Sequence, residues 1–267
     1  MNECLKNLNR IEFVVTMACT GRCRHCSEGE HVSVGECIEP DAAVQAIYDL
    51  CKFYKIKSLM TFGGEPLLYP EVVCTIHEAA KKMNIQQRDL ITNGFFSKDE
   101  KRIKEVAHML AKSGVCNILL SVDAFHQETI PLYPVKLFAE CIKKEEIRLR
   151  LSPAWLVSKE DNNIYNQRTK SILREFEQLD IPVGRGNVIF PSGNAKKYLS
   201  EYFDAETEYV NPYEEDPKDI RTISFNPNGD VLNGNINKSS MAGFHSILRY
   251  SRIVGKDRVC SQATTYT

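Results

Sequence analysis

The sequence predicts an α/β fold in which six strands form a parallel sheet connected by helices. Short runs rich in Val, Ile, Leu and Phe alternate with longer segments whose apolar residues recur at helical spacing. The chain has 267 residues, of which 43% are hydrophobic, so it can bury the core of one large α/β domain. A disordered or fibrous protein is not expected.

The elements follow in order along the chain. The candidate strands are Ile11–Thr16, Ser58–Phe62, Asp89–Thr92, Ile118–Val122, Ile147–Ser152 and Pro182–Ile189. The intervening helices are expected at Asp41–Tyr54, Glu71–Met83, Lys98–Ser113, Val135–Lys144 and Ile164–Leu179. Asp41 after Pro40 marks one helix start, and Ser97 ahead of Asp99 marks another.

The character of the chain changes after Ile189. A last helix is expected within Pro191–Phe203, and residues 204–219 form an acidic connection with two prolines. Two β-prone runs flank Asn228-Gly229, a pattern typical of a hairpin, and a short helix is predicted at Phe244–Val254. We therefore predict a core over 1–203, an acidic connection over 204–219 and a hairpin-and-helix extension over 220–267.

Charge and hydropathy exclude several function classes. Lys and Arg number 34 against 35 Asp and Glu, so no net field attracts nucleic acid or anionic lipid. The N-terminus MNECLKNLNR has no secretory signal pattern, and no apolar stretch is long enough to span a bilayer. We expect a cytoplasmic protein that binds neither nucleic acid nor membrane.

Ten cysteines are spread thinly over the chain, which predicts reduced thiols instead of a disulfide framework. Cys51, Cys74, Cys116 and Cys141 lie in or beside apolar patterns and are expected to be small buried hydrophobic residues.

A different arrangement follows the first predicted strand, where CTGRCRHC places Cys19, Cys23 and Cys26 in a C-x3-C-x2-C loop. Parallel α/β proteins place their sites at this carboxyl edge. Thiolate ligands favour zinc or iron–sulfur clusters, and three cysteines on a four-iron cluster leave one iron open for a small molecule. Two alternatives remain: His25 completes a zinc site, or Cys23 and Cys26 form a redox pair.

The loop resembles the signature of the radical S-adenosylmethionine (radical SAM) enzymes, and three strand ends agree with it. Gly63-Gly64-Glu65-Pro66 is similar to the family's GGE motif, and Thr92-Asn93-Gly94 is similar to its TNG motif. The segment from Ser121 to His126 is similar to the S-x-D-x-x-H pattern of several subgroups. The resemblance covers Ile11 to Ile189 and implies a partial (β/α)6 TIM-like barrel with a small C-terminal extension.

The resemblance also implies roles for residues that bind S-adenosylmethionine. The backbone at Gly63 and Gly64 and the Glu65 carboxylate would bind the ammonium group, because glycine permits close approach and Glu65 supplies complementary charge.

Further along the same edge, Asn93, Ser121 and Asp123 would face the ribose hydroxyls or the methionine carboxylate. His25 takes the position before the third cysteine, where the backbone contacts adenine and the family more often has Phe or Tyr. On the substrate side, His126 is a candidate acid and Arg150 a candidate anion clamp, each with an equally simple structural explanation.

The implied function is reductive cleavage of S-adenosylmethionine at a 4Fe–4S cluster held by Cys19, Cys23 and Cys26. The resulting 5′-deoxyadenosyl radical would abstract hydrogen from a small molecule or a peptide in natural-product maturation, with flavodoxin or ferredoxin as electron donor. Only Cys260 follows Cys141, which predicts a single cluster and no metal at Cys260. The alternatives are a glycyl-radical enzyme activase and, from another class, a non-catalytic iron–sulfur or zinc-binding module.

Overall fold

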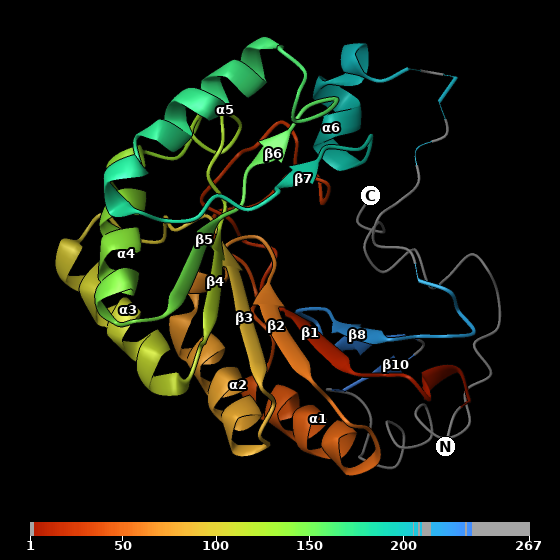
Figure 1. Ribbon diagram of the computed structural model, residues 1–267. Helices are drawn as coiled ribbons and strands as arrows, with labels where there is room; N and C mark the ends of the chain where they lie inside the picture. The colour runs from red at the N-terminus through yellow and green to blue at the C-terminus, as the bar shows by residue number, and fades with distance from the viewer. Residues whose placement is uncertain (1–2, 205, 208, 210–214, 233, 237–267) are drawn as a thin grey trace.

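The main sheet of the computed structural model confirms the predicted α/β class (Figure 1). The structure describes residues 3–204, 206–207, 209, 215–232 and 234–236. The six parallel strands are β1 (Arg10–Val14), β2 (Ser58–Phe62), β3 (Gln87–Thr92), β4 (Asn117–Leu120), β5 (Arg148–Leu151) and β8 (Thr222–Phe225). Their order is β5-β4-β3-β2-β1-β8, so the sheet is open, with β5 and β8 at its edges.

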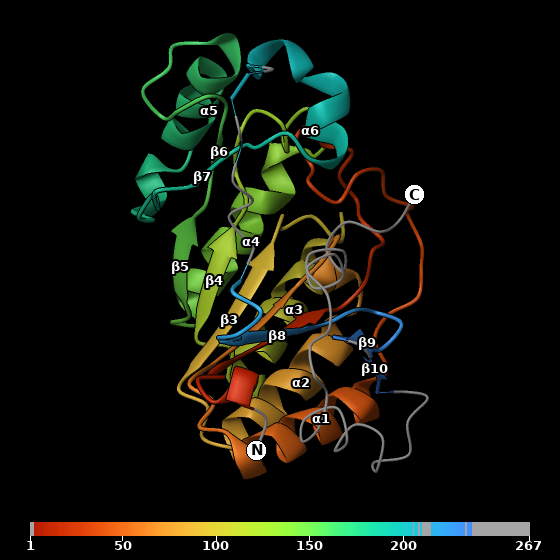
Figure 2. The same cartoon turned by 90° about the vertical axis from the view of Figure 1, so that its right-hand side faces the viewer.

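Four helices cover one face of this sheet, and among the described residues no helix lies over the opposite face, here called the open face (Figures 1 and 2). The covering helices are α1 (Pro40–Phe53), α2 (Pro70–Lys82), α3 (Glu100–Ser113) and α4 (Leu132–Lys144). Beyond the carboxyl ends of the strands lie α5 (Ile164–Arg174) and α6 (Gly193–Tyr198). Short 3-10 helices occupy Glu3–Leu5, Pro66–Leu68, Glu177–Leu179 and Ser200–Tyr202. The described helices include none long and apolar enough to cross a membrane.

Helix ends follow from local sequence. Pro40 occupies the first turn of α1, one residue before the predicted start. The Asp99 side chain accepts a hydrogen bond from Lys101 N and caps α3. Gly114 ends α3 with φ +91°, a left-handed conformation that glycine adopts without strain.

The apolar core lies between the sheet and its covering helices. Alternate strand positions such as Leu90 and Ile118 are completely buried against α3 and α4, and Ile11 and Phe13 are buried against α1. The Phe13 and Phe225 rings stack with centroids 4.9 Å apart, so β8 belongs to this core. The nine cysteines in the described residues are all free thiols. Cys74 and Cys141 are buried as expected, whereas Cys51 and Cys116 are only half-buried.

The sixth predicted strand, Pro182–Ile189, is wrong as a member of the main sheet. Val183 makes one isolated bridge to β5, and β7 (Asn187–Val188) pairs with β6 (Ala154–Trp155) in a separate two-stranded sheet. Gly186 interrupts the segment with φ +73°, and a Cβ there would lie 2.1 Å from the Pro153 carbonyl oxygen. A continuous strand cannot pass through that conformation.

The sixth strand is instead β8, which the sequence assigned to a hairpin around Asn228-Gly229. A turn does form there, with Gly229 N donating to Asn226 O at 2.8 Å. However, β8 pairs in parallel with β1, and the described antiparallel pair is β9 (Asp230–Val231) with β10 (Gly234–Asn235). Pairing with β1 buries the apolar side chains of Ile223 and Phe225 in the core, which explains why this strand joins the main sheet.

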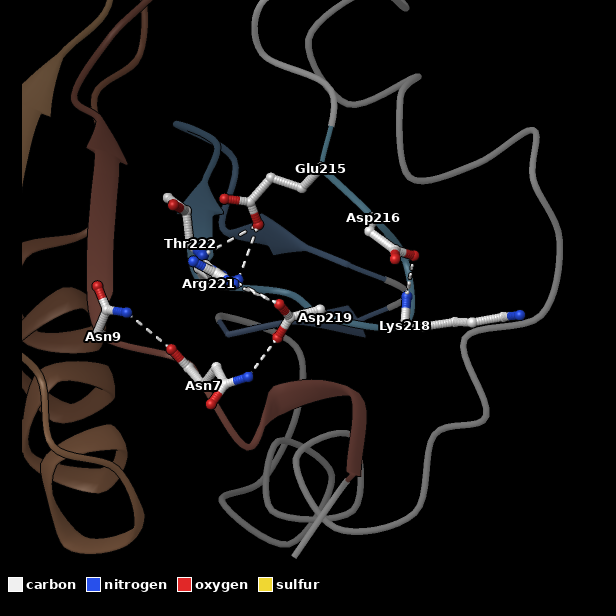
Figure 3. Close-up of polar contacts among 8 residues, drawn as sticks. All are labelled: Asn7, Asn9, Glu215, Asp216, Lys218, Asp219, Arg221 and Thr222. Atoms are coloured by element: carbon white, nitrogen blue, oxygen red, sulfur yellow. Dashed lines mark hydrogen bonds and ion pairs between the residues drawn. The ribbon is translucent and has the colours of Figure 1, made fainter.

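Polar contacts attach the start of β8 to the N-terminal segment (Figure 3). Asp219 accepts hydrogen bonds from Asn7 Nδ2 at 2.6 Å and from Arg221 Nη2 at 2.8 Å. Glu215 accepts from the backbone N–H groups of Arg221 and Thr222 at 3.0 and 3.1 Å. The domain boundaries near 203 and 219 stay predictions. The helix at Phe244–Val254 and Cys260 lie outside the described residues.

Candidate active site

Strand register arranges the open face of the sheet in layers. Aligned across β1 to β5, the first layer consists of Met60 and four polar residues, Glu12, Asp89, Asn117 and Arg148. One step nearer the carboxyl ends lie Val14, Phe62, Ile91, Leu119 and Arg150, which line a cavity of about 1200 Å³. This second layer is apolar except at the β5 edge. The rim of the cavity is the carboxyl edge of the sheet, where the sequence motifs after β1 to β4 lie.

The loop after β1 brings the three predicted metal ligands to this cavity. Cys19 and Cys23 are buried, Cys26 is half-buried, and all three line the cavity. A Cβ added to Gly21 would lie 3.2 Å from Cys23 Sγ and 3.7 Å from Cys19 Sγ. These two thiols therefore flank one space, which a side chain at position 21 would crowd.

The donor set fits an iron–sulfur cluster. Burial raises the pKa of Cys19 to about 11 and that of Cys26 to about 12, and it raises the pKa of Cys23 as well. The thiols therefore need a bound metal to become thiolates near neutral pH. Within the described chain no fourth cysteine lines the cavity, as expected for a cluster with one open iron.

Two glycines after β2 let the strand end approach the segment that leads to Cys19. Gly64 N donates to Thr16 O at 2.8 Å. A Cβ on Gly64 would lie 2.2 Å from Ala18 O, and a Cβ on Gly63 would lie 2.4 Å from Thr16 O. The glycine pair is therefore a packing requirement of the cysteine loop.

Glu65 faces into the protein. Its carboxylate is completely buried and accepts hydrogen bonds from Leu67 N, Thr92 Oγ1 and Asn93 N at 2.9, 2.7 and 2.8 Å. Burial raises the pKa of Glu65 to about 7, against the effect of these donors. Asn93 Nδ2 then lies 3.6 Å from Cys19 Sγ. Glu65 thus positions Asn93, and its contact with a ligand ammonium stays a prediction.

Ser121 and Asp123 line the cavity beyond β4, and Asp123 is also fully engaged. It accepts from the backbone N–H groups of Phe125, His126 and Ala154 at 2.9 to 3.0 Å and lies 2.8 Å from His126 Nδ1. Burial opposes its ionisation, but the nearby His126 holds the pKa of Asp123 well below its usual range. Although burial acts in the opposite direction, Asp123 raises the pKa of His126.

His25 lies between the cysteine loop and the segment after β4. Its ring centroid is 4.9 Å from those of Phe125 and His126. Burial lowers the pKa of His25 to about 4, so the ring is neutral at pH 7. Its Nδ1 atom is buried and has no hydrogen-bond partner among the described residues.

Arg150 reaches the cavity at the β5 edge, as predicted, and Arg185 joins it there. Neither guanidinium has an ion-pair partner in the described part of the chain, whereas Arg10 in the same cavity pairs with Glu12 at 2.7 Å. The Arg150 stem passes close to Gly184, where an added Cβ would lie 3.7 Å from Arg150 Cδ. This edge of the cavity therefore carries uncompensated positive charge.

Two residues that sequence reasoning missed hold the cysteine loop. Asn194 donates from its backbone to Cys26 O at 2.9 Å and from Nδ2 to Cys23 O at 3.1 Å. His31 Nε2 lies 3.1 Å from Cys26 Sγ. Asn194 is 171 residues from Cys23, so no local pattern could reveal it. His31 could have been suspected from the sequence, because it follows Cys26 by only five residues.

Comparison with known proteins adds a family and a fold. The model of the Radical SAM superfamily matches residues 13–151. The Bacillus subtilis (strain 168) protein named "Putative peptide biosynthesis protein YydG" is 24% identical over 156 residues, which cover 58% of this chain and 49% of YydG. GTP 3′,8-cyclase of Rippkaea orientalis is 29% identical over 118 residues, which cover 42% of this chain and 33% of the cyclase. The chain thus spans half or less of these curated relatives.

Among solved structures, Streptococcus suis SuiB bound to its precursor peptide SuiA has a TM-score of 0.57 at 12% identity. The match covers 95% of this chain and 67% of SuiB. SuiB bound to S-adenosylmethionine has a TM-score of 0.55 at 11% identity and covers 98% and 69% of the two chains. At this identity the likeness shows a shared fold.

Proposed function

Because this chain belongs to the radical SAM superfamily, we propose that it cleaves S-adenosylmethionine at a cluster held by Cys19, Cys23 and Cys26 and abstracts hydrogen from a peptide. The family uses a 4Fe–4S cluster and S-adenosylmethionine as its cofactors, and the chain is an enzyme of this class. The specific reaction and the peptide substrate are our proposal.

One observation carries the proposal: the three thiols of the cysteine loop and the polar ends of β2, β3 and β4 line one cavity. When bound and reduced, the cluster would supply the one electron that splits S-adenosylmethionine into methionine and a 5′-deoxyadenosyl radical. The protein's part is to hold and orient these groups and to exclude water.

The residues at the rim receive distinct roles. The open backbone at Gly63 and Gly64 and the side chain of Ser121 line the cavity and would contact S-adenosylmethionine directly. Asn93 also lines the cavity and donates toward Cys19, so it would link the cofactor to the cluster loop. Glu65 acts on Asn93, and Asp123 acts on His126, as positioning residues. The neutral His25 ring would lie beside the adenine.

The substrate side of the cavity supports a peptide with an anionic group. An apolar layer of Val14, Phe62, Ile91 and Leu119 leads to the positive edge at Arg150 and Arg185. Guanidinium groups without partners suit a carboxylate, such as an acidic side chain or a chain terminus. The name of YydG and the precursor peptide bound to SuiB also favour a peptide over a small molecule. His126 lies in the same cavity and remains the candidate acid.

We further propose a single cluster and an electron donor of the flavodoxin or ferredoxin type. Of the nine described cysteines, Cys19, Cys23 and Cys26 are the three that line the cavity. We therefore assign one cluster to the described residues.

The test is anaerobic reconstitution with iron and sulfide, reduction with dithionite and addition of S-adenosylmethionine. We expect about four irons per chain and formation of 5′-deoxyadenosine. Replacing Cys19, Cys23 or Cys26 with Ala should abolish both, and the matched Cys51→Ala control should retain both. A wild-type chain that carries the cluster but forms no 5′-deoxyadenosine would contradict the proposal.

A further inference from the structure

Three potential metal ligands gather at a point that the cluster does not fully use. One ligand atom each from Cys23, His25 and His126 lies within 4.8 Å of the other two. Cys23 and His25 come from the loop after β1, and His126 comes from the segment after β4. All three residues line the cavity.

His126 is oriented as zinc-binding histidines usually are. Asp123 Oδ2 lies 2.8 Å from His126 Nδ1, which leaves Nε2 as the nitrogen available for a metal. The Asp123 carboxylate is itself fixed by the backbone N–H groups of Phe125 and Ala154. A carboxylate behind a histidine ligand fixes the tautomer and orientation of its ring.

His25 supplies an independent observation. Its ring is held between Phe125 and His126, and its buried Nδ1 has no hydrogen-bond partner in the described residues. Leaving a buried ring nitrogen unpaired is unfavourable. A cation bound by this histidine, directly at Nδ1 or after a ring flip, would relieve this cost.

The other two cysteines have partners of their own. Cys19 Sγ accepts from Gly21 N at 3.3 Å and from Asn93 Nδ2 at 3.6 Å. Cys26 Sγ lies 3.1 Å from His31 Nε2. Cys23 is therefore the cysteine of the loop that faces the two other potential ligands.

We propose that, in the chain without its cluster, Cys23, His25 and His126 bind one zinc ion with the fourth position open to the cavity. One thiolate and two imidazoles suit zinc, and zinc sites with three protein ligands leave a position for water. Tetrahedral bonds of roughly 2.0–2.3 Å place ligand atoms about 3.3–3.8 Å apart, so the three side chains must close by about 1 Å.

The consequence goes beyond the proposed function. Zinc and the iron–sulfur cluster would compete for Cys23, so a zinc-loaded chain cannot complete its cluster until zinc leaves. The two states differ in their other ligands, because the cluster needs Cys19 and Cys26 whereas zinc needs the two histidines. This difference makes the zinc site testable without any enzymatic activity.

The experiment is anaerobic titration of the cluster-free chain with Co²⁺, followed by displacement with Zn²⁺. We expect one Co²⁺ per chain, a sulfur-to-cobalt charge-transfer band and the strong visible bands of tetrahedral cobalt. Cys23→Ser should abolish the charge-transfer band, and His25→Gln and His126→Gln should each weaken Co²⁺ binding at least about tenfold. Cys19→Ser and Cys26→Ser should bind as the wild type does, as should the exposed control His108→Gln.

Equal loss in Cys19→Ser or Cys26→Ser would overturn the proposal, because zinc would then lie among the three cysteines. Unchanged binding in both histidine variants would overturn it as well. Circular dichroism of each metal-free variant checks its folding. As a second measurement on the wild type, Zn²⁺ added before iron and sulfide should reduce the iron incorporated, and the His25→Gln/His126→Gln double variant should resist this effect. Equal inhibition in both proteins also contradicts the proposal.

Discussion

Replacing Gly64 with Ala should damage both stability and cluster binding. The added Cβ would lie 2.2 Å from Ala18 O and 2.9 Å from Met17 O, both backbone atoms that cannot rotate away. A carbon and an oxygen in contact need about 3.2 Å, so the strand end and the loop must separate by about 1 Å. That movement breaks the bond from Gly64 N to Thr16 O, which is worth about 1 kcal/mol, and overpacking adds about 1–3 kcal/mol.

Urea unfolding at pH 7 should therefore show a loss of about 2–4 kcal/mol in the free energy of unfolding. Iron content after reconstitution should fall too, because the displaced segment leads directly into Cys19. Gly35→Ala is the matched control, since its Cβ would meet nothing closer than 3.4 Å, at Ala18 Cβ. A Gly64→Ala chain with wild-type stability and full iron content would refute the reasoning.

Three further predictions test other parts of the structure. Burial lowers the pKa of His77 to about 3 from 6.5, so below pH 6.5 the unfolded chain binds the proton that the folded chain rejects. His77 should therefore contribute a loss of about 2 kcal/mol in stability between pH 7 and pH 5, measured in urea unfolding as the difference between the wild type and His77→Gln. Phe225→Ala should lower the free energy of unfolding by about 3–5 kcal/mol in a single transition, because Phe225 is completely buried. The control Val34→Ala should change it little, because Val34 is exposed. A separate early transition would show that β8 is not part of the core. The double variant Arg150→Ala/Arg185→Ala should weaken binding of labelled poly-glutamate at least about tenfold at low salt. The control is Arg148→Ala, which should bind as the wild type does because the Arg148 guanidinium already bonds Cys116 O. Equal affinities of the double variant and the wild type would contradict the proposed role of the positive edge.

Local sequence predicted much of this fold correctly. Strands β1 to β5 and helices α1 to α5 lie where apolar periodicity placed them, within a few residues. The cysteine loop lies at a strand end, as predicted, beside the glycine pair and Asn93. These features depend on neighbours within about one turn or one strand, so spacing alone reveals them.

Local sequence misassigned the sixth strand for a physical reason. Pro182–Ile189 is apolar enough to suggest a strand, but Gly186 adopts φ +73° and diverts the backbone. Thr222–Phe225 has the same short apolar alternation, and only the exposed edge of β1 determines that it joins the main sheet. Strand propensity does not specify a partner that lies more than 200 residues away, as Asn7 and Asp219 show.

The sequence by itself indicated the family and predicted the ligand chemistry, because three thiols in one short loop and polar groups after successive strands are local patterns. Tertiary structure alone decided what each side chain faces. It turned Glu65 inward onto Asn93 and gave the Asp123 carboxylate backbone N–H donors. It left Arg150 and Arg185 without carboxylate partners among the described residues, and it brought His126 close to His25 and Cys23. The physical reason is that hydrogen-bond partners and charge compensation are set by contacts between distant segments, which residue type and spacing do not encode.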